Sequence, residues 1–200
     1  CCLVGSEMCI RDRFTTGINN VITNQKVIPA HLMDPKIKNR SRLFYLMANI
    51  EASLFKGENN WPLMLDTDGY IAEGSGDNFF IVKNNTVISP EGRNMLRGIS
   101  RDYVMNDLCK TLNINVIEKN IEPYDVYEAD EAFICATPFC MLPVTTLNSL
   151  KIGDGKPGKV FNKLIQLWSK KTGVDIIKQI ESWNKEIENT KNKVTPYKFK

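Results

Sequence analysis

Cysteine and histidine are side chains that often bind metals or act as nucleophiles and bases. The 200-residue chain has only one histidine, His31, but six cysteines. The cysteines are Cys1, Cys2, Cys9, Cys109, Cys135 and Cys140. None forms a CxxC pair, and the spacing fits neither a zinc site nor a disulfide framework. We therefore expect no metal site, core positions for the three later cysteines, and a structural role for His31.

A different chemistry, the binding of anions, could reside at the start of a predicted helix. The turn at Gly98 leads into a helix predicted from Ser100, so the free backbone N–H groups of Ile99 and Ser100 could face an anion. Serine is also a favoured N-cap residue, so an ordinary helix start explains the same pattern. Arg42 could bind a carboxylate through two parallel hydrogen bonds, or it could form a surface ion pair.

The elements that would position these residues form one α+β domain. Helices are predicted where apolar residues recur at helical spacing, over 43–54, 100–112, 160–168 and 175–185. The first of these helices has an apolar stripe made of Leu43, Leu46, Met47, Ile50 and Leu54. Short strands are predicted over 62–66, 70–74, 78–82, 86–89, 116–118, 132–137 and 141–147. Two turns, at Asp68-Gly69 and Asn84-Asn85, have the residues that tight hairpins favour.

Composition narrows the class of protein further. Hydrophobic residues make up 42% of the chain and charged residues 24%, which suits a folded domain with a real core. The net charge of +3 argues against a dedicated nucleic-acid binder. No run of about 18 apolar residues occurs, so we expect no membrane span. The absence of a secretory signal and of a disulfide framework favours a cytoplasmic location.

The ends of the chain differ from its centre. Residues 1–13 read CCLVGSEMCIRDR and resemble a translated sequencing adapter, although a genuine segment of odd composition is the alternative. The chain does not begin with Met, so we expect it to be truncated at its N-terminus. We expect an extended or interdomain segment over 14–36, one large domain over 37–183, and a polar, frayed tail over 184–200.

Four segments in a fixed order give the most specific signal. They are DPKIKNRSRLFYLMANIEA (34–52), LDTDGYIAEGSGDNFFIV (65–82), MLRGISRDYV (95–104) and DEAFICATPFCMLPV (130–144). Together they resemble the class IV, or fold-type IV, aminotransferases, which depend on pyridoxal 5'-phosphate. Within that family the chain most resembles branched-chain amino-acid aminotransferases. The resemblance implies the large C-terminal domain of the D-amino-acid aminotransferase-like fold, with the small N-terminal domain largely missing.

The resemblance assigns a role to one lysine and one glutamate. Lys38 matches the catalytic lysine that forms a Schiff base with the cofactor and then moves a proton. Lys36 is the nearby alternative, but it would put the spacing to Ala52 out by two residues. Glu73 matches the partner of the pyridine nitrogen, because the run from Glu73 to Phe80 follows the pattern E-G-x-x-x-N-x-F.

The resemblance also implies a set of contacts around the cofactor and substrate. The implied cofactor-binding residues are Lys38, Glu73, Asn78, Leu96, Gly98, Ile99, Ser100 and Thr137. Leu96 would pack on the ring, while Ile99, Ser100 and Thr137 would hold the phosphate. The implied substrate-binding residues are Arg42, Pro138 and Phe139. Arg42 replaces a tyrosine usual in the branched-chain enzymes, and Pro138 lacks the N–H that could bind a substrate carboxylate.

The expected activity is transfer of an amino group between an amino acid, branched-chain-like or a related amine donor, and a 2-oxo acid. The expected assembly is a homodimer. One alternative is a lyase acting on an aminated chorismate, whose pattern Arg42 fits. A second alternative is an inactive fragment or binding module of the same fold.

Overall fold

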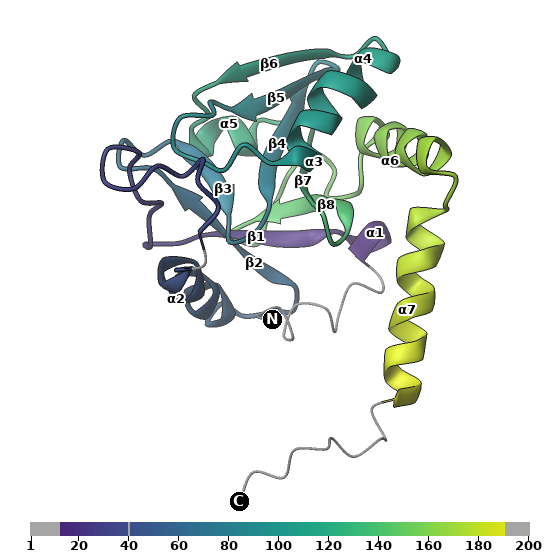
Figure 1. Cartoon of the computed structure of the whole chain (residues 1–200), viewed down its shortest axis with the longest axis horizontal. Helices are drawn as coiled ribbons and strands as arrows, with labels where there is room; N and C mark the ends of the chain where they lie inside the picture. The colour runs from purple at the N-terminus through teal and green to yellow at the C-terminus, as the bar shows by residue number, and fades with distance from the viewer. Residues whose placement is uncertain (1–12, 40, 191–200) are drawn as a thin grey trace, which may run out of the picture.

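The computed structural model describes residues 13–39 and 41–190, and the side chains of these residues through 183. The adapter-like segment therefore lies outside the described residues except for Arg13, which begins helix α1. Helices are α1 (Arg13–Thr16), α2 (Leu43–Ser53), α3 (Ile99–Tyr103), α4 (Cys109–Thr111), α5 (Pro123–Tyr127), α6 (Lys159–Thr172) and α7 (Ile176–Thr190). A π-helical turn, Val104–Leu108, joins α3 to α4. The predicted helix over 100–112 is therefore confirmed as one continuous helical segment. Figure 1 shows α7 leading away from the body of the domain.

The strands form one mixed sheet. They are β1 (Ile18–Ile22), β2 (Asn60–Leu65), β3 (Ile71–Gly74), β4 (Asn78–Lys83), β5 (Thr86–Pro90), β6 (Asn115–Lys119), β7 (Glu131–Ala136), β8 (Cys140–Leu147) and β9 (Leu150–Lys151). Their order is β3-β2-β1-β8-β7-β4-β5-β6, and β9 pairs with β8. The predicted hairpins β2–β3 and β4–β5 are confirmed. Asn84 and Asn85 both adopt positive φ at the second turn, as its tight geometry requires.

A single additional pairing gives the sheet its barrel-like form. Strand β3 pairs with β2 on one side and with β4 on the other, which closes β3, β2, β1, β8, β7 and β4 into a ring. The pair that closes the ring is Glu73 opposite Asn78. Two residues assigned to the cofactor by sequence therefore meet at the closure of the ring.

Most of the buried apolar side chains form one core cluster. The strands β4 and β7 contribute Phe80 and Phe133, whose rings stack with centroids 4.9 Å apart. Helix α6 packs Phe161 against the same cluster. Cys109 and Cys135 are buried as predicted, and Cys140 is half-buried. Burial raises the pKa of the Cys109 thiol to about 12, which suits a core residue better than a nucleophile.

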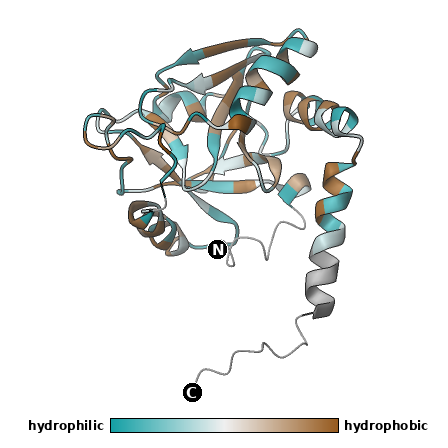
Figure 2. Ribbon diagram, viewed as in Figure 1, coloured by the Kyte–Doolittle hydropathy of each residue, from teal (hydrophilic) through white to brown (hydrophobic). Residues whose placement is uncertain are grey.

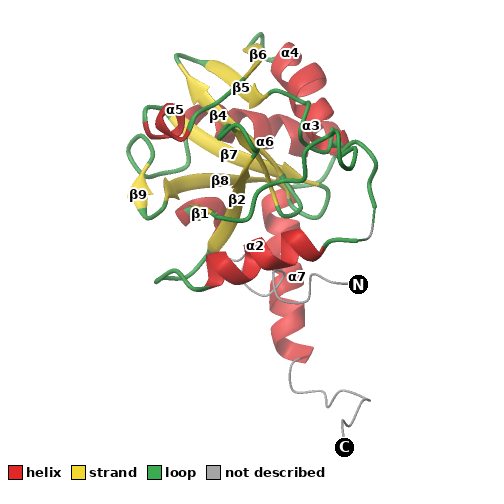
Figure 3. Cartoon of the chain, turned by 90° about the vertical axis from the view of Figure 1, so that its left-hand side faces the viewer, coloured by secondary structure: helices red, strands yellow, loops and turns green. Residues whose placement is uncertain are grey.

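Helix α2 forms where it was predicted, but its orientation is unexpected. The apolar stripe faces solvent: Leu43 is 68% and Leu46 55% exposed. The side against β2 is instead made of the small residues Ala48 and Ala52, both fully buried. Alanine lets the helix approach the sheet closely, so α2 packs on β2 through its side of small residues. Figure 3 shows this helix outside the strands, and Figure 2 shows hydrophobic residues along it.

Among the described residues, no helix is long and apolar enough to cross a membrane.

Candidate active site

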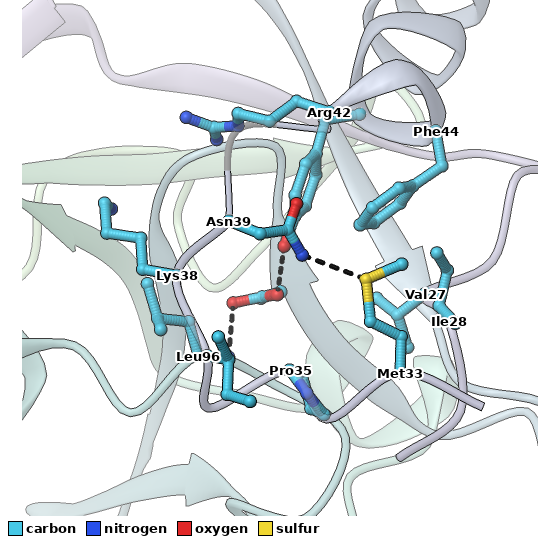
Figure 4. Close-up of a pocket in the computed structure, with 12 residues that line it drawn as sticks. Val27, Ile28, Met33, Pro35, Lys38, Asn39, Arg42, Phe44 and Leu96 are labelled. Carbon is cyan, nitrogen blue, oxygen red and sulfur yellow. Dashed lines mark hydrogen bonds between the residues drawn. The ribbon is translucent and has the colours of Figure 1, made fainter. Parts of the chain in front are cut away.

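A pocket lies between the segment that precedes α2, the start of α2 itself, and the end of β3 (Figure 4). Its lining combines apolar side chains with a few polar ones. The lining residues are Val27, Ile28, Met33, Pro35, Ile37, Lys38, Asn39, Arg42, Phe44, Tyr45, Glu73 and Leu96. Four residues that the sequence assigned to the site therefore share one pocket: Lys38, Arg42, Glu73 and Leu96.

Glu73 is the most tightly held polar group of the pocket. It lies in β3, whose four residues are all buried, and is itself only 4% exposed. The hydroxyl of Tyr45 donates a hydrogen bond to Oε1 at 2.7 Å, and the backbone N–H of Leu96 donates to Oε2 at 3.0 Å. Burial raises the pKa of Glu73 to about 7, and these two hydrogen bonds oppose that rise. Each carboxylate oxygen still has a lone pair that a further donor could use.

Leu96 is fixed by the two residues that close the ring. Its N–H binds Glu73, and its carbonyl accepts a hydrogen bond of 2.8 Å from the side-chain amide of Asn78. Gly98 makes room for this arrangement, because a Cβ atom there would lie 2.3 Å from Oδ1 of Asn78. The closure of the ring thus sets the position of the loop that carries Leu96.

Lys38 lies at the exposed rim of the pocket. In Figure 4 its side chain runs along the rim and its amine points outward. Lys36, the alternative lysine, is tied to Asp34 by an ion pair of 2.7 Å and does not line the pocket. Of the two lysines, Lys38 is therefore the one placed beside Glu73 in a shared cavity.

Arg42 and Tyr45 connect the rim to the buried carboxylate. The Arg42 guanidinium lies 4.9 Å from the centre of the Tyr45 ring and donates a hydrogen bond to the Ser75 carbonyl. Burial, and then the nearby charge of Glu73, raise the pKa of the Tyr45 hydroxyl well above its usual range. Tyr45 therefore stays protonated and keeps donating its hydrogen bond to Glu73.

Sequence reasoning missed Tyr45. The available signal was the spacing of Phe44, Tyr45, Ala48 and Ala52, which places them on one side of a helix. The apolar stripe on the opposite side is more hydrophobic, so hydrophobicity alone predicts that the stripe is the buried side. In this chain Tyr45, Ala48 and Ala52 lie on the side of α2 that packs on the sheet.

Other predicted site residues lie outside this pocket. Gly98 and Ile99 line a separate hollow together with Arg101 and Glu118, and Ile99 is 88% exposed. Ser100 lines neither hollow. The N-cap of α3 is Gly98, so the ordinary capping role considered for Ser100 is wrong.

The β7–β8 turn also lies apart from the pocket lining. Thr137 and Pro138 are exposed there. Phe139 is 5% exposed and packs edge-on against Trp61 at 5.6 Å. The roles of these residues toward phosphate and substrate stay predictions.

Comparison with known proteins identifies the class to which this fold corresponds. Residues 11–147 match the family model described as amino-transferase class IV. The chain belongs to the class IV aminotransferase family, and its fold is that of the large domain of the fold-type IV enzymes.

Its relatives and structural neighbours include several branched-chain enzymes. A branched-chain-amino-acid aminotransferase of Pseudomonas aeruginosa is 40% identical over 102 residues, which cover 51% of this chain and 33% of the relative. The T.th. branched-chain amino acid aminotransferase, solved with pyridoxamine 5'-phosphate, matches with a TM-score of 0.73 and 30% identity. That match covers 76% of this chain and 50% of the solved chain. The Escherichia coli enzyme matches with a TM-score of 0.74 and 28% identity, over 78% of this chain and 51% of that one. The chain thus spans about half or less of the length of these proteins.

Proposed function

We propose that the pocket beside Glu73 binds pyridoxal 5'-phosphate and that the protein is a transaminase. It would move an amino group between a branched-chain-like amino acid, or a related amine donor, and a 2-oxo acid. The observation that carries the proposal is the shared cavity of Lys38 and Glu73, with the carboxylate buried and doubly hydrogen-bonded. Family membership supports the same reaction class.

The residues of the pocket suit this cofactor. Burial raises the pKa of the Glu73 carboxyl, and a protonated ring nitrogen beside it would favour its charged form. The aromatic and aliphatic lining from Val27, Phe44 and Leu96 suits a flat ring. When bound, the cofactor supplies an aldehyde carbon for an amine and a ring that takes up electrons from the substrate.

Glu73, Lys38 and Leu96 would each have a separate role toward the cofactor. Oxygens of Glu73 would accept the N–H of the ring and keep its proton in place, because Tyr45 and Leu96 hold the carboxylate in one orientation. Lys38 would swing inward from the rim and, once its amine is free, move a proton at Nζ between substrate and cofactor atoms. Leu96, fixed by Asn78, would press on one face of the ring.

Further parts of the proposal rest on the resemblance. The N–H groups of Ile99 and Ser100, with the Thr137 hydroxyl, would bind the phosphate. Arg42, at the rim, would meet a substrate carboxylate together with residues of the Pro138–Phe139 turn. A cytoplasmic homodimer belongs to the same proposal. The branched-chain names of the relatives favour transamination over the lyase alternative.

Chemical trapping of the cofactor tests the proposal. The chain is incubated with pyridoxal 5'-phosphate, reduced with borohydride, digested, and mapped by mass spectrometry. We expect the label on Lys38, loss of the label in Lys38→Ala, and retention in the matched control Lys36→Ala. A label on Lys36 or Lys56 that survives Lys38→Ala would overturn the assignment.

A further inference from the structure

A second buried carboxyl group lies just beyond Glu73. Asp77 follows the β3–β4 turn and precedes Asn78, the residue that pairs with Glu73 across the closure of the ring. The backbone N–H of Gly74 donates to the Asp77 carbonyl at 3.0 Å, so the turn is tight. The Asp77 carboxyl lies over Gly74, where a Cβ atom would be 2.3 Å from its Oδ1. The glycine thus leaves the space that this carboxyl fills.

The two carboxyl groups are solvated very differently by the protein. Glu73 accepts one hydrogen bond on each oxygen. Oδ1 of Asp77 is buried and has no hydrogen-bond partner, and no ion pair reaches Asp77 among the described residues. Donors stabilise a charged carboxylate, and burial with fewer donors favours the neutral acid. The negative charge of the pair is therefore better placed on Glu73.

Among residues 13–39 and 41–183, the groups that face Asp77 offer no positive charge to change this balance. They are Glu73 from β3, the Tyr45 hydroxyl from α2 and the Cys135 thiol from β7. Burial, followed by the charge of Glu73, raises the pKa of Asp77 to about 8, while the backbone of Gly76 opposes the rise. Arg42 and Lys38 act on Glu73 instead, where they favour its charged form.

We propose that Glu73 loses its proton before Asp77, so that the first negative charge of the buried pair resides on Glu73 while Asp77 keeps its proton. The charge then sits on the carboxylate that faces the pocket and not on the one behind it. A cation entering the pocket, such as a protonated ring nitrogen, meets one well-placed charge. The value of this arrangement for catalysis rests on the proposed function of Glu73.

The order in which the two groups lose their protons tests the inference. Carbon-13 NMR of the cofactor-free chain, labelled at the side-chain carboxyls of Asp and Glu, follows both titrations. We expect Glu73 to ionise at lower pH than Asp77 in the unsubstituted chain. Ionisation of Asp77 first, in the ordinary range of an exposed aspartate, would overturn the proposal.

Two variants sharpen the test because the coupling is asymmetric. Glu73→Gln removes the like charge and should lower the pKa of Asp77. Asp77→Asn removes a group that is still neutral when Glu73 titrates, so the pKa of Glu73 should stay unchanged. A fall in the pKa of Glu73 in Asp77→Asn would contradict the assignment.

Two checks keep the result clear. Asp66→Asn, which removes a buried carboxyl from the neighbouring β2–β3 turn, should leave both titrations unchanged. If a variant fails to fold, the order of titration in the unsubstituted chain still decides the question. The titration is measured without cofactor, so a result against this inference would not contradict the proposed function. The trapping experiment tests the proposed function separately.

Discussion

The two walls of the pocket are built in contrasting ways. The strand wall, made of Glu73, Asn78 and Leu96, is a network in which each polar side chain has a defined partner. The loop wall, made of residues 27–39 and the start of α2, has Lys38 exposed at its rim and an apolar stripe open to solvent beside it. Both walls carry a residue that the proposed chemistry requires, but only the strand wall holds its residue in one place.

Under the proposed function, the two walls have two different tasks. A carboxylate that fixes a ring nitrogen must not move, and closing the sheet into a ring at Glu73 and Asn78 provides that rigidity. A lysine that bonds to a cofactor and later moves a proton needs freedom to swing. The exposed rim gives Lys38 that freedom.

Replacing the lysine should have the largest effect. Lys38→Ala should lower the transamination rate at least about 10³-fold, because the group that bonds to the cofactor and moves the proton is lost. The fold should persist, since Lys38 is exposed. Rates with pyridoxal 5'-phosphate, an amino donor and a 2-oxo acid measure the loss, and Lys36→Ala is the control. Comparable rates in the two variants would break the assignment of the loop wall.

The pH dependence of the free energy of unfolding should reveal the cost of burying two carboxyl groups beside the strand wall. Burial raises the pKa of Glu73 from 4.5 to about 7 and that of Asp77 from 3.8 to about 8. The folded chain therefore holds protons that the unfolded chain has released, so stability falls as pH rises from about 5 to 8. The slope is about 1.4 kcal/mol per pH unit for each group that holds its proton.

Urea unfolding of the cofactor-free chain at several pH values measures this slope. Asp77→Asn should make it shallower, because one of the two groups no longer titrates. A free energy of unfolding that is constant or rises over this pH range would show that the buried carboxyls are ionised in the folded chain.

Crowding the strand wall should cost a smaller amount. Gly98→Ala puts a methyl group 2.3 Å from Oδ1 of Asn78, so the hydrogen bond that holds Leu96 must shift. We expect a loss of ~1–3 kcal/mol in the free energy of unfolding. Gly57→Ala is no matched control because Gly57 has a positive φ. Gly76→Ala serves better, since the nearest atom to its Cβ is the flexible end of Arg42 at 3.6 Å.

Substitutions on the two sides of α2 should differ in effect, and the exposed side should give the smallest change of all. Ala48→Leu overfills the buried side and should destabilise the chain by ~1–3 kcal/mol. Ile50→Ser on the half-exposed stripe should change stability by about 0.5 kcal/mol or less, because the two residues have similar helix propensity. Thermal unfolding of the two variants measures the difference. Equal destabilisation would mean that the stripe is packed in solution.

Local patterns predicted the two hairpins and the longer helices of this chain, but not the short helices α1 and α5. Turn residues such as Asn84-Asn85 act over a few positions, so the strands beside them follow from the sequence alone. The closure of the ring at Glu73 and Asn78 could not be predicted, because it depends on how distant strands pair. The resemblance indicated Lys38 and Glu73 as site residues. The hydrogen bond from Tyr45 to Glu73 could not be predicted, because it depends on the orientation of α2, which hydrophobicity alone predicts wrongly.

The central claim is that Glu73 keeps a bound ring nitrogen protonated, and nitrogen-15 NMR tests it most directly. Pyridoxal 5'-phosphate labelled at the ring nitrogen is bound to the unsubstituted chain and to Glu73→Gln, and the nitrogen shift is followed against pH. We predict a protonated ring nitrogen in the unsubstituted chain at neutral pH, and an unprotonated one in Glu73→Gln, whose neutral amide cannot stabilise the charge. The same nitrogen shift in both proteins would contradict the account.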